Sequence, residues 1–164
     1  MFGNRITTAY SNAQSIEEAV FDADVVIGGV LVPGAAAPKL VTQEHVAHMK
    51  TGAVMVDVAI DQGGCFETSH ATTHADPVYE VNGVVHYCVA NMPGAVARTS
   101  TFAFNNATIG HAIALADKGW ERAMKEDVHL RRGLNVCKSN VTYQAVARDL
   151  GYKYVAPEAL LEGN

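Results

Sequence analysis

The residues best placed to do chemistry follow a short apolar run at 54–60. Asp61 and Gln62, an acid and an amide, are followed at once by Gly63 and Gly64. Glycine allows backbone angles and close ligand approach that a Cβ prevents. Because ligands of open α/β sheets bind beyond the carboxyl ends of the strands, we expect Asp61 to lie in a ligand site. The same pattern is also typical of an ordinary turn in which Asp61 has no ligand.

Histidines are the other candidates for chemistry. His70 and His74 are four residues apart, a spacing found in helical metal pairs. They lie in the polar stretch 65–77, which we expect to be a solvated loop, so we predict no metal site. We expect His86 and His111 to satisfy local hydrogen bonds rather than to act as catalysts.

Composition limits the class of protein. The 164 residues, 49% hydrophobic and 18% charged, suit one globular domain, or one domain with a small appendage. The net charge of −5 argues against nucleic-acid binding. The longest apolar run, 27–38, is broken by glycines and prolines, so we predict no membrane span. Without a signal peptide or a paired cysteine framework, the sequence predicts a reducing, cytoplasmic location, with buried, idle thiols.

Elements that could position these residues alternate along the chain. β-Branched apolar runs predict strands, with the central one buried on both faces, at 5–10, 24–29, 54–59 and 84–89. Capping residues and spacing predict helices that begin near Ser15, Thr42 and Thr142. Such alternation indicates βαβ units around a parallel sheet.

A long helix is expected near the C-terminus. The region 99–118 has apolar residues around most of its circumference, which predicts a well-buried helix ended by Gly119. A second helical stretch is expected at 120–132. We therefore divide the chain into residues 1–97, an α/β portion, and residues 98–164, a set of C-terminal helices.

One expected motif is absent. A doubly wound dinucleotide fold normally begins with a strand, a G-x-G-x-x-G turn and a helix, and the turn lets backbone N–H groups approach the pyrophosphate. This sequence contains no G-x-G-x-x-G. We predict the α/β class: part of a doubly wound, Rossmann-type parallel sheet that lacks its first βαβ unit, followed by the C-terminal helices.

Three long stretches, 31–41, 48–65 and 87–96, closely resemble the NAD-dependent alanine dehydrogenase family, and the resemblance extends over essentially the whole chain. The related nicotinamide nucleotide transhydrogenases share this frame, but in them an acid is usually followed by Ala-Gly-Gly-Asn. The run Asp61 to Cys65, Asp-Gln-Gly-Gly-Cys, therefore favours alanine dehydrogenase.

The resemblance implies a reaction and a cofactor. It implies that L-alanine and pyruvate plus ammonia are interconverted with hydride transfer to and from NAD. Asp61 resembles the family's active-site aspartate, which accepts from the cofactor ribose or holds a catalytic water. Ser11 matches a residue near the adenine end of the cofactor. Further cofactor contacts are implied at Val30 and Leu31 in a loop, and around the nicotinamide half at Val58, Val89, Asn91 and Met92. No metal is implied.

The resemblance also implies what the sequence lacks. The family's substrate-gripping Arg and Lys, its proton-transferring His and its G-x-G-x-x-G turn would all precede Met1. We therefore expect a fragment: residues 1–97 as the second portion of the NAD-binding domain, and residues 98–164 as helices that pack toward an absent substrate domain. Alone it should have little activity, and L-alanine or pyruvate would be its partners only if the missing domain were supplied. A homo-oligomer is expected.

Two alternatives remain at this point. The chain could be a non-catalytic module for dinucleotide binding or for oligomerisation. It could also be a transhydrogenase-like NAD-binding module, which would bind a dinucleotide without alanine chemistry.

Overall fold

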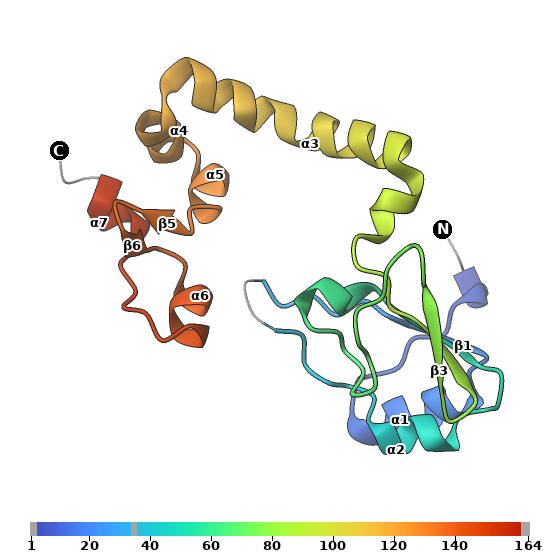
Figure 1. The fold of residues 1–164 in the computed structure, drawn as a ribbon. Coiled ribbons are helices and arrows are strands. Elements are labelled where there is room, and N and C mark those ends of the chain that lie inside the picture. The colour runs from blue at the N-terminus through green and yellow to red at the C-terminus, as the bar shows by residue number, and fades with distance from the viewer. Residues whose placement is uncertain (1–2, 34–35, 162–164) are drawn as a thin grey trace. The chain divides into compact units, whose positions relative to one another are not determined.

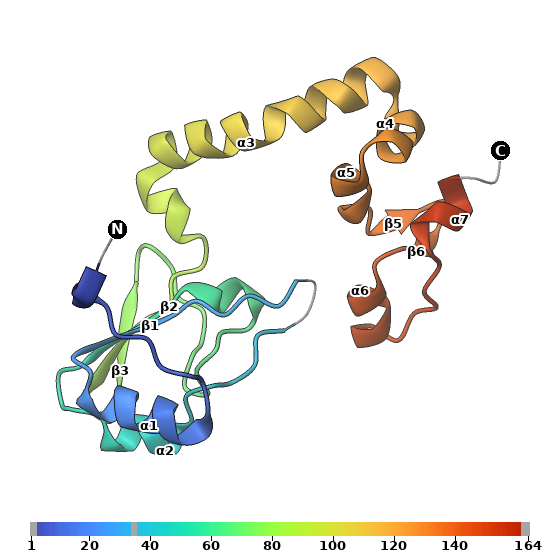
Figure 2. The same cartoon turned by 180° about the vertical axis from the view of Figure 1, so that it is seen from behind.

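The computed structural model describes residues 3–33 and 36–161. The chain forms two compact units (Figures 1 and 2). The first unit runs up to Met92 apart from a short stretch at 33–35, and the second comprises the chain from Pro93 onward.

The first unit is built on a four-stranded, mostly parallel sheet. Its order is β1-β2-β4-β3, and the strands span Val25–Gly28, Val54–Asp57, Val84–Tyr87 and Val78–Val81 respectively. β1 pairs parallel with β2, and β2 pairs parallel with β4. This arrangement confirms the α/β class and three of the predicted strands. It also brings the chain segments that follow β1, β2 and β4 to one edge of the sheet.

The fourth strand is antiparallel and was not predicted. β3 pairs with β4 through a tight turn at Asn82 and Gly83, whose φ angles are 53° and 78°. Two positive φ angles with Asn-Gly are the signature of a type I′ hairpin turn. The dipeptide between two apolar runs was therefore the signal in the sequence for this strand.

Helices cover one face of this sheet. α1 (Ala13–Asp22) and α2 (Gln43–His48) lie together on it in Figure 1. Val20 and Val46 from these helices share a buried core with Met55 of β2 and Val84 of β4. Val54 and Val56, which alternate with Met55 along β2, are only half-buried. The expectation that the central strand is buried on both faces is wrong, because only one helical layer covers the sheet within the described residues of this unit.

The predicted helix caps are partly correct. Thr42 caps α2 as expected: its Oγ1 accepts from the His45 N–H at 3.2 Å, and His45 Nδ1 accepts from the Thr42 N–H at 3.3 Å. Asn12, not Ser15, caps α1, with Ser15 as the reciprocal third residue. The predicted strand at 5–10 is wrong. A single turn of 3₁₀ helix, Gly3–Arg5, precedes irregular chain there, which has no strand partner among the described residues.

His86 is a buried polar residue of β4. In the neutral ring, Nδ1 donates to the Val84 carbonyl oxygen at 3.0 Å, and Nε2 accepts from the Thr68 hydroxyl at 2.8 Å. The ring also stacks on Tyr79 with centroids 5.0 Å apart. These contacts confirm the expectation that His86 satisfies local hydrogen bonds. Burial lowers the pKa of His86, because the charged ring loses its hydration.

The second unit is mainly helical, with one short hairpin. Its elements are α3 (Ala97–Lys118), α4 (Trp120–Glu126), α5 (Val128–Arg132), β5 (Val136–Cys137), β6 (Asn140–Val141), α6 (Gln144–Asp149) and α7 (Pro157–Leu161). Gly119, with φ 73°, follows α3 as predicted. Thr142 does not cap the next helix: it is buried and donates to the Leu134 carbonyl oxygen at 2.8 Å.

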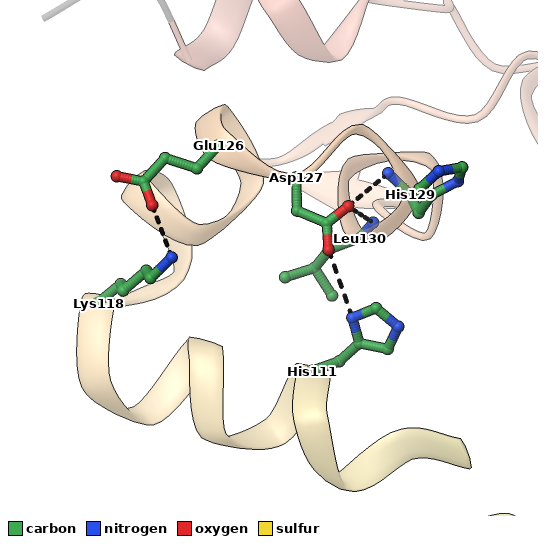
Figure 3. A network of polar contacts seen from close by, with 6 residues as sticks. All are labelled: His111, Lys118, Glu126, Asp127, His129 and Leu130. Atoms are coloured by element: carbon green, nitrogen blue, oxygen red, sulfur yellow. Dashed lines mark hydrogen bonds and ion pairs between the residues drawn. The ribbon is translucent and has the colours of Figure 1, made fainter.

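A polar network divides the predicted stretch 120–132 into two helices (Figure 3). Asp127 caps α5, since its Oδ1 accepts from the backbone N–H groups of His129 and Leu130 at 2.8 and 3.2 Å. Its other oxygen lies 3.5 Å from His111 of α3. The neighbouring Glu126 accepts a hydrogen bond from the Lys118 ammonium at 2.7 Å. The hydrogen bonds from Lys118 and Arg122 lower the pKa of Glu126 to about 2. These pairs join the end of α3 to α4 and α5.

The expectation that the long helix is buried is wrong. No described residue of α3 is buried, and Phe104 is 72% exposed. The apolar residues of α3 are spread around the helix, while within its own unit mainly α4 packs against it, at one end. No helix among the described residues meets the length and hydropathy needed to span a bilayer.

The lowered pKa of His86 predicts acid-sensitive stability. The unfolded chain, with a histidine pKa near 6.5, takes up a proton that the folded chain resists, so stability should fall as the pH drops below about 6.5. Urea unfolding at pH 7.5 and 5.5 should show a loss of at most about 1.4 kcal/mol from this residue. His86→Gln should show a smaller pH dependence than the wild type, whereas the exposed His129→Gln should match it. An equal pH dependence in both variants would contradict the assignment.

Candidate functional site

Two adjoining cavities lie where β1 and β2 end. The first, called here the Ser11 cavity, has a volume of about 330 Å³ and is lined mainly by α1, the end of β1 and Phe66. The second, called the Asp61 cavity, has a volume of about 370 Å³ and is lined by Gly29, Val30, Leu31, Val58, Ala59, Asp61 and Gln62. Gly29 and Val30 line both cavities. This is the edge of an α/β sheet at which ligands bind.

The cavities bring together most of the residues proposed from the sequence. Ser11 and Val30 line the first cavity, and Val30 recurs in the second with Leu31, Val58 and Asp61. Their binding role remains a proposal. Val89, Asn91 and Met92 follow β4 at the same sheet edge but line neither cavity. Val89 is fully buried, and the Asn91 carbonyl oxygen accepts from His74.

A buried carboxylate, which the sequence analysis did not single out, fixes the loop that carries Asp61. Asp57, the last residue of β2, is 0% exposed. Its oxygens accept hydrogen bonds from the backbone N–H groups of Ala59 at 3.0 Å and Cys65 at 2.9 Å. The Ser69 hydroxyl donates to it at 2.5 Å. Asp57 thereby caps the 3₁₀ helix Val58–Gln62, on which Asp61 is exposed. The signal in the sequence for this role was the position of Asp57, an acid within an otherwise apolar strand.

The thiol beside this carboxylate is buried and hydrogen-bonded to it. The Cys65 Sγ is 3.5 Å from Asp57 and donates its proton to it. Burial and the adjacent negative charge raise the pKa of the Cys65 thiol to about 11, because both oppose the thiolate. A neutral, buried thiol is a poor nucleophile. The expectation that Cys65 is buried is confirmed.

The segment 37–40 also bonds to the loop that carries Asp61. The Ala37 N–H donates to the Gln62 carbonyl oxygen at 3.0 Å, and the Leu40 N–H donates to that of Cys65 at 2.8 Å. The Lys39 ammonium donates to the carbonyl oxygens of Gly63 at 2.6 Å and Phe66 at 3.1 Å. Because its backbone groups are bonded on both sides, the Asp61 loop has a fixed conformation.

Glycines at the site have different tasks. A Cβ on Gly28 would overlap the Cys65 Sγ and lie 2.6 Å from a ring carbon of Phe66, so this position must lack a side chain. A Cβ on Gly29 would meet nothing within 4 Å. Gly64 has φ 75°, and a Cβ there would lie 2.7 Å from Asp57 Oδ2. Gly64 therefore serves the packing of Asp57, while Gly63 remains open on its Cβ side.

Gln62 holds an unpaired acceptor at this site. Its side-chain oxygen Oε1 is buried without a hydrogen-bond partner, and no other buried side-chain nitrogen or oxygen in the described part of the chain lacks one. Buried polar atoms are almost always bonded, so each exception calls for an explanation. In the sequence, this amide is recognisable only as part of the strand end that carries Asp61.

The histidine pair is engaged in other contacts. The His70 ring stacks on Tyr79 with centroids 3.7 Å apart, and His74 Nε2 donates to the Asn91 carbonyl oxygen at 3.0 Å. Within residues 3–33 and 36–161, no three or more His, Cys, Asp or Glu side chains are grouped so that they could hold a metal ion.

Comparisons with known proteins agree on one family. A family model described as "Alanine dehydrogenase/PNT, C-terminal domain" matches residues 1–144. The chain is 59% identical to the alanine dehydrogenase of Halomonas elongata over 98% of its own length, and 56% identical to that of Bacillus subtilis over 99%. It covers 43% of each of these two proteins, so it spans less than half the length of the curated relatives that it matches.

Solved structures give the same result. An L-alanine dehydrogenase superposes with a TM-score of 0.78 at 51% identity, over 92% of this chain and 41% of that one. A transhydrogenase from Sinorhizobium meliloti superposes with a TM-score of 0.54 at 34% identity, over 63% of this chain and 31% of that one. The predicted fold class is thus confirmed by a solved relative.

Filling the space beside Gly28 should destabilise the first unit. Gly28→Ala pushes a methyl group against two buried side chains, and overpacking of this kind costs about 1–3 kcal/mol. Gly29→Ala, one residue along, meets open space and should change the free energy of unfolding by less than about 0.5 kcal/mol. Urea denaturation of both variants is the measurement, and equal stabilities would show that the packing at Gly28 is not tight.

Removing the charge of Asp57 should cost more than removing that of Asp61. Asp57→Asn replaces one carboxylate oxygen with an NH₂ group facing donors, which should lower the free energy of unfolding by roughly 2–4 kcal/mol. Asp61→Asn, at an exposed position, should change it by less than about 0.5 kcal/mol. Chemical denaturation at pH 7 measures both values. An Asp57→Asn variant with the free energy of unfolding of the wild type would refute the role given to this carboxylate.

Proposed function

Because the chain belongs to the alanine dehydrogenase/PNT family, we propose that it forms part of the NAD-binding domain of an NAD-dependent L-alanine dehydrogenase. Its share of the reaction is to hold the base and ribose ends of the cofactor. The whole activity, interconversion of L-alanine and pyruvate with ammonia, belongs in this proposal to a protein that contains this chain.

The observation that supports the proposal most is the pair of adjoining cavities. A dinucleotide has two nucleoside halves joined at the middle, and two cavities with a common wall at Gly29 and Val30 suit such a shape. Ser11, expected near the adenine end, lines one cavity, and Asp61, expected beside the nicotinamide, lines the other. The resemblance would thus assign the adenine end of NAD to the Ser11 cavity and the nicotinamide end to the Asp61 cavity.

The residues present fit the ends of NAD rather than its middle. Val30, Leu31 and Val58 give the Asp61 cavity apolar walls, which suit an aromatic ring, and Gln62 adds an unpaired acceptor. The pyrophosphate has no G-x-G-x-x-G turn in this sequence to receive it. We therefore assign the chain the nucleoside contacts and no pyrophosphate contact.

NAD, when bound, supplies the hydride acceptor at its nicotinamide ring. The chain's own residues would orient that ring and keep water away. Leu31 and Val58 would lie against the ring and exclude solvent from the reacting face. Asp61, exposed on a loop that Asp57 fixes, would accept a hydrogen bond from a ribose hydroxyl or hold a water for the reaction.

Location and assembly form a further part of the proposal. Three free, buried cysteines suit a reducing compartment, and we place the protein in the cytoplasm. Exposed apolar side chains such as Ile27, 69% exposed, and Phe104 suit burial in a homo-oligomer or against another domain.

A transhydrogenase-like module is the second candidate. The 34% identical transhydrogenase structure supports it, and it would bind a dinucleotide without alanine chemistry. The order Asp61-Gln62-Gly63-Gly64-Cys65 favours the first candidate, because in transhydrogenases the acid is usually followed by Ala-Gly-Gly-Asn.

Titration of the purified chain with NADH tests the cofactor site. The wild type should bind, and Asp61→Ala should weaken binding about tenfold, because one hydrogen bond to a charged acceptor is lost. Asp76→Ala removes an exposed carboxylate from a loop that lines neither cavity and should leave the affinity unchanged. Isothermal calorimetry gives the three dissociation constants. Absence of NADH binding by the wild type would refute the proposed function, and equal affinities would remove Asp61 from it.

A further inference from the structure

We infer that Gln62 is a specificity-determining residue that recognises the carboxamide group on the nicotinamide head. This inference rests on the proposed function, since it assigns one further contact within the Asp61 cavity. Gln62 directly follows Asp61, the aspartate that the family resemblance singles out.

The starting point is an acceptor that the fold itself leaves unpaired. Gln62 Oε1 is buried, and it has no hydrogen-bond partner. Gln62 lines the Asp61 cavity and is itself only half-buried, so its amide would have to turn about the side-chain bonds to present the oxygen to a ligand there. An unpaired buried acceptor destabilises the folded chain, and a ligand that brings a donor to it removes that penalty on binding.

The backbone of Gln62 is held in place before any ligand arrives. Its carbonyl oxygen accepts from the Ala37 N–H at 3.0 Å. It ends the 3₁₀ helix that Asp57 caps, and Gly63 follows with φ 89° and donates back to that helix. A ligand therefore meets an acceptor whose main chain is already ordered, so little further conformational entropy is lost on binding.

The chemistry of the cavity selects the carboxamide as the donor. An amide oxygen only accepts, so the ligand must offer an N–H or O–H group. The carboxamide NH₂ group supplies the N–H donors of the nicotinamide head, and it projects from a ring that the apolar walls would surround. The ribose hydroxyls suit Asp61 better, because an ionised, exposed acceptor forms stronger bonds to them.

A cofactor analogue isolates this contact. Reduced 3-acetylpyridine adenine dinucleotide has a methyl group where NADH has the carboxamide NH₂ group, and it keeps the carbonyl, both riboses and the phosphates. The wild-type chain should bind NADH about five- to tenfold more tightly than the analogue, the ratio expected for one neutral hydrogen bond. Gln62→Met keeps the length of the side chain without the acceptor, and should bind both ligands equally.

Matched controls separate recognition from folding. Gln43→Met makes the same chemical change at an exposed position and should keep the wild-type preference for NADH. Gln62→Met removes an unpaired buried acceptor, so its thermal midpoint without ligand should equal or exceed that of the wild type. A lower midpoint would mean that Gln62 has a structural partner, and it would overturn the inference.

The outcomes of the titrations are distinguishable. If the wild type binds NADH but shows no preference over the analogue, or if Gln62→Met keeps the preference, the inference fails and the proposed function stands. If neither dinucleotide binds to the wild type, the proposed function fails, and the inference fails with it. Loss of the preference in Gln62→Met alone, with unchanged affinity for the analogue, supports the inference.

Discussion

The buried carboxylate of Asp57 is the interaction on which the site depends. A negative charge without exposure to water is tolerated only when hydrogen bonds replace its hydration, and here backbone N–H groups and a hydroxyl from the following loop do so. The strand end and the loop are thereby joined at one point. Because Asp57 caps the 3₁₀ helix that follows, the same bonds set the direction in which Asp61 and Gln62 leave the sheet.

Packing around this carboxylate extends to the neighbouring strand. Cys65 bonds to Asp57 and lies against Gly28 at the end of β1, where a side chain would not fit. Gly29, one residue further, is free of such contacts and forms part of the wall between the two cavities. The position of the cavities thus follows from the core beneath them. Cys65 and Phe66 pack closely against Gly28, which fixes the loop after β2, and the next two residues, Gly29 and Val30, line both cavities.

Local sequence patterns predicted much of the fold, and the failures have physical causes. The strands around Val26, Val56 and Val85 and the Thr42 cap are set by neighbours in sequence, and they were found. The 5–10 segment has a strand-like composition but pairs with no strand in the described part of the chain, and no local pattern reveals this. The hairpin turn at Lys138 and Ser139 has two positive φ angles without glycine or asparagine at its centre, so its residue types gave no signal.

The sequence by itself determined the α/β class, the family resemblance and the place of Asp61 beyond a strand, because these follow from residue order and from propensities over a few residues. Only the tertiary structure decided the exposure of α3, the role of Asp57 and the unpaired oxygen of Gln62. Burial and hydrogen-bond satisfaction depend on which distant segments meet. The loop from Gly63 to Ser69 folds back onto Asp57, and segment 37–43 bonds along this loop. No residue type within either segment alone predicts these contacts.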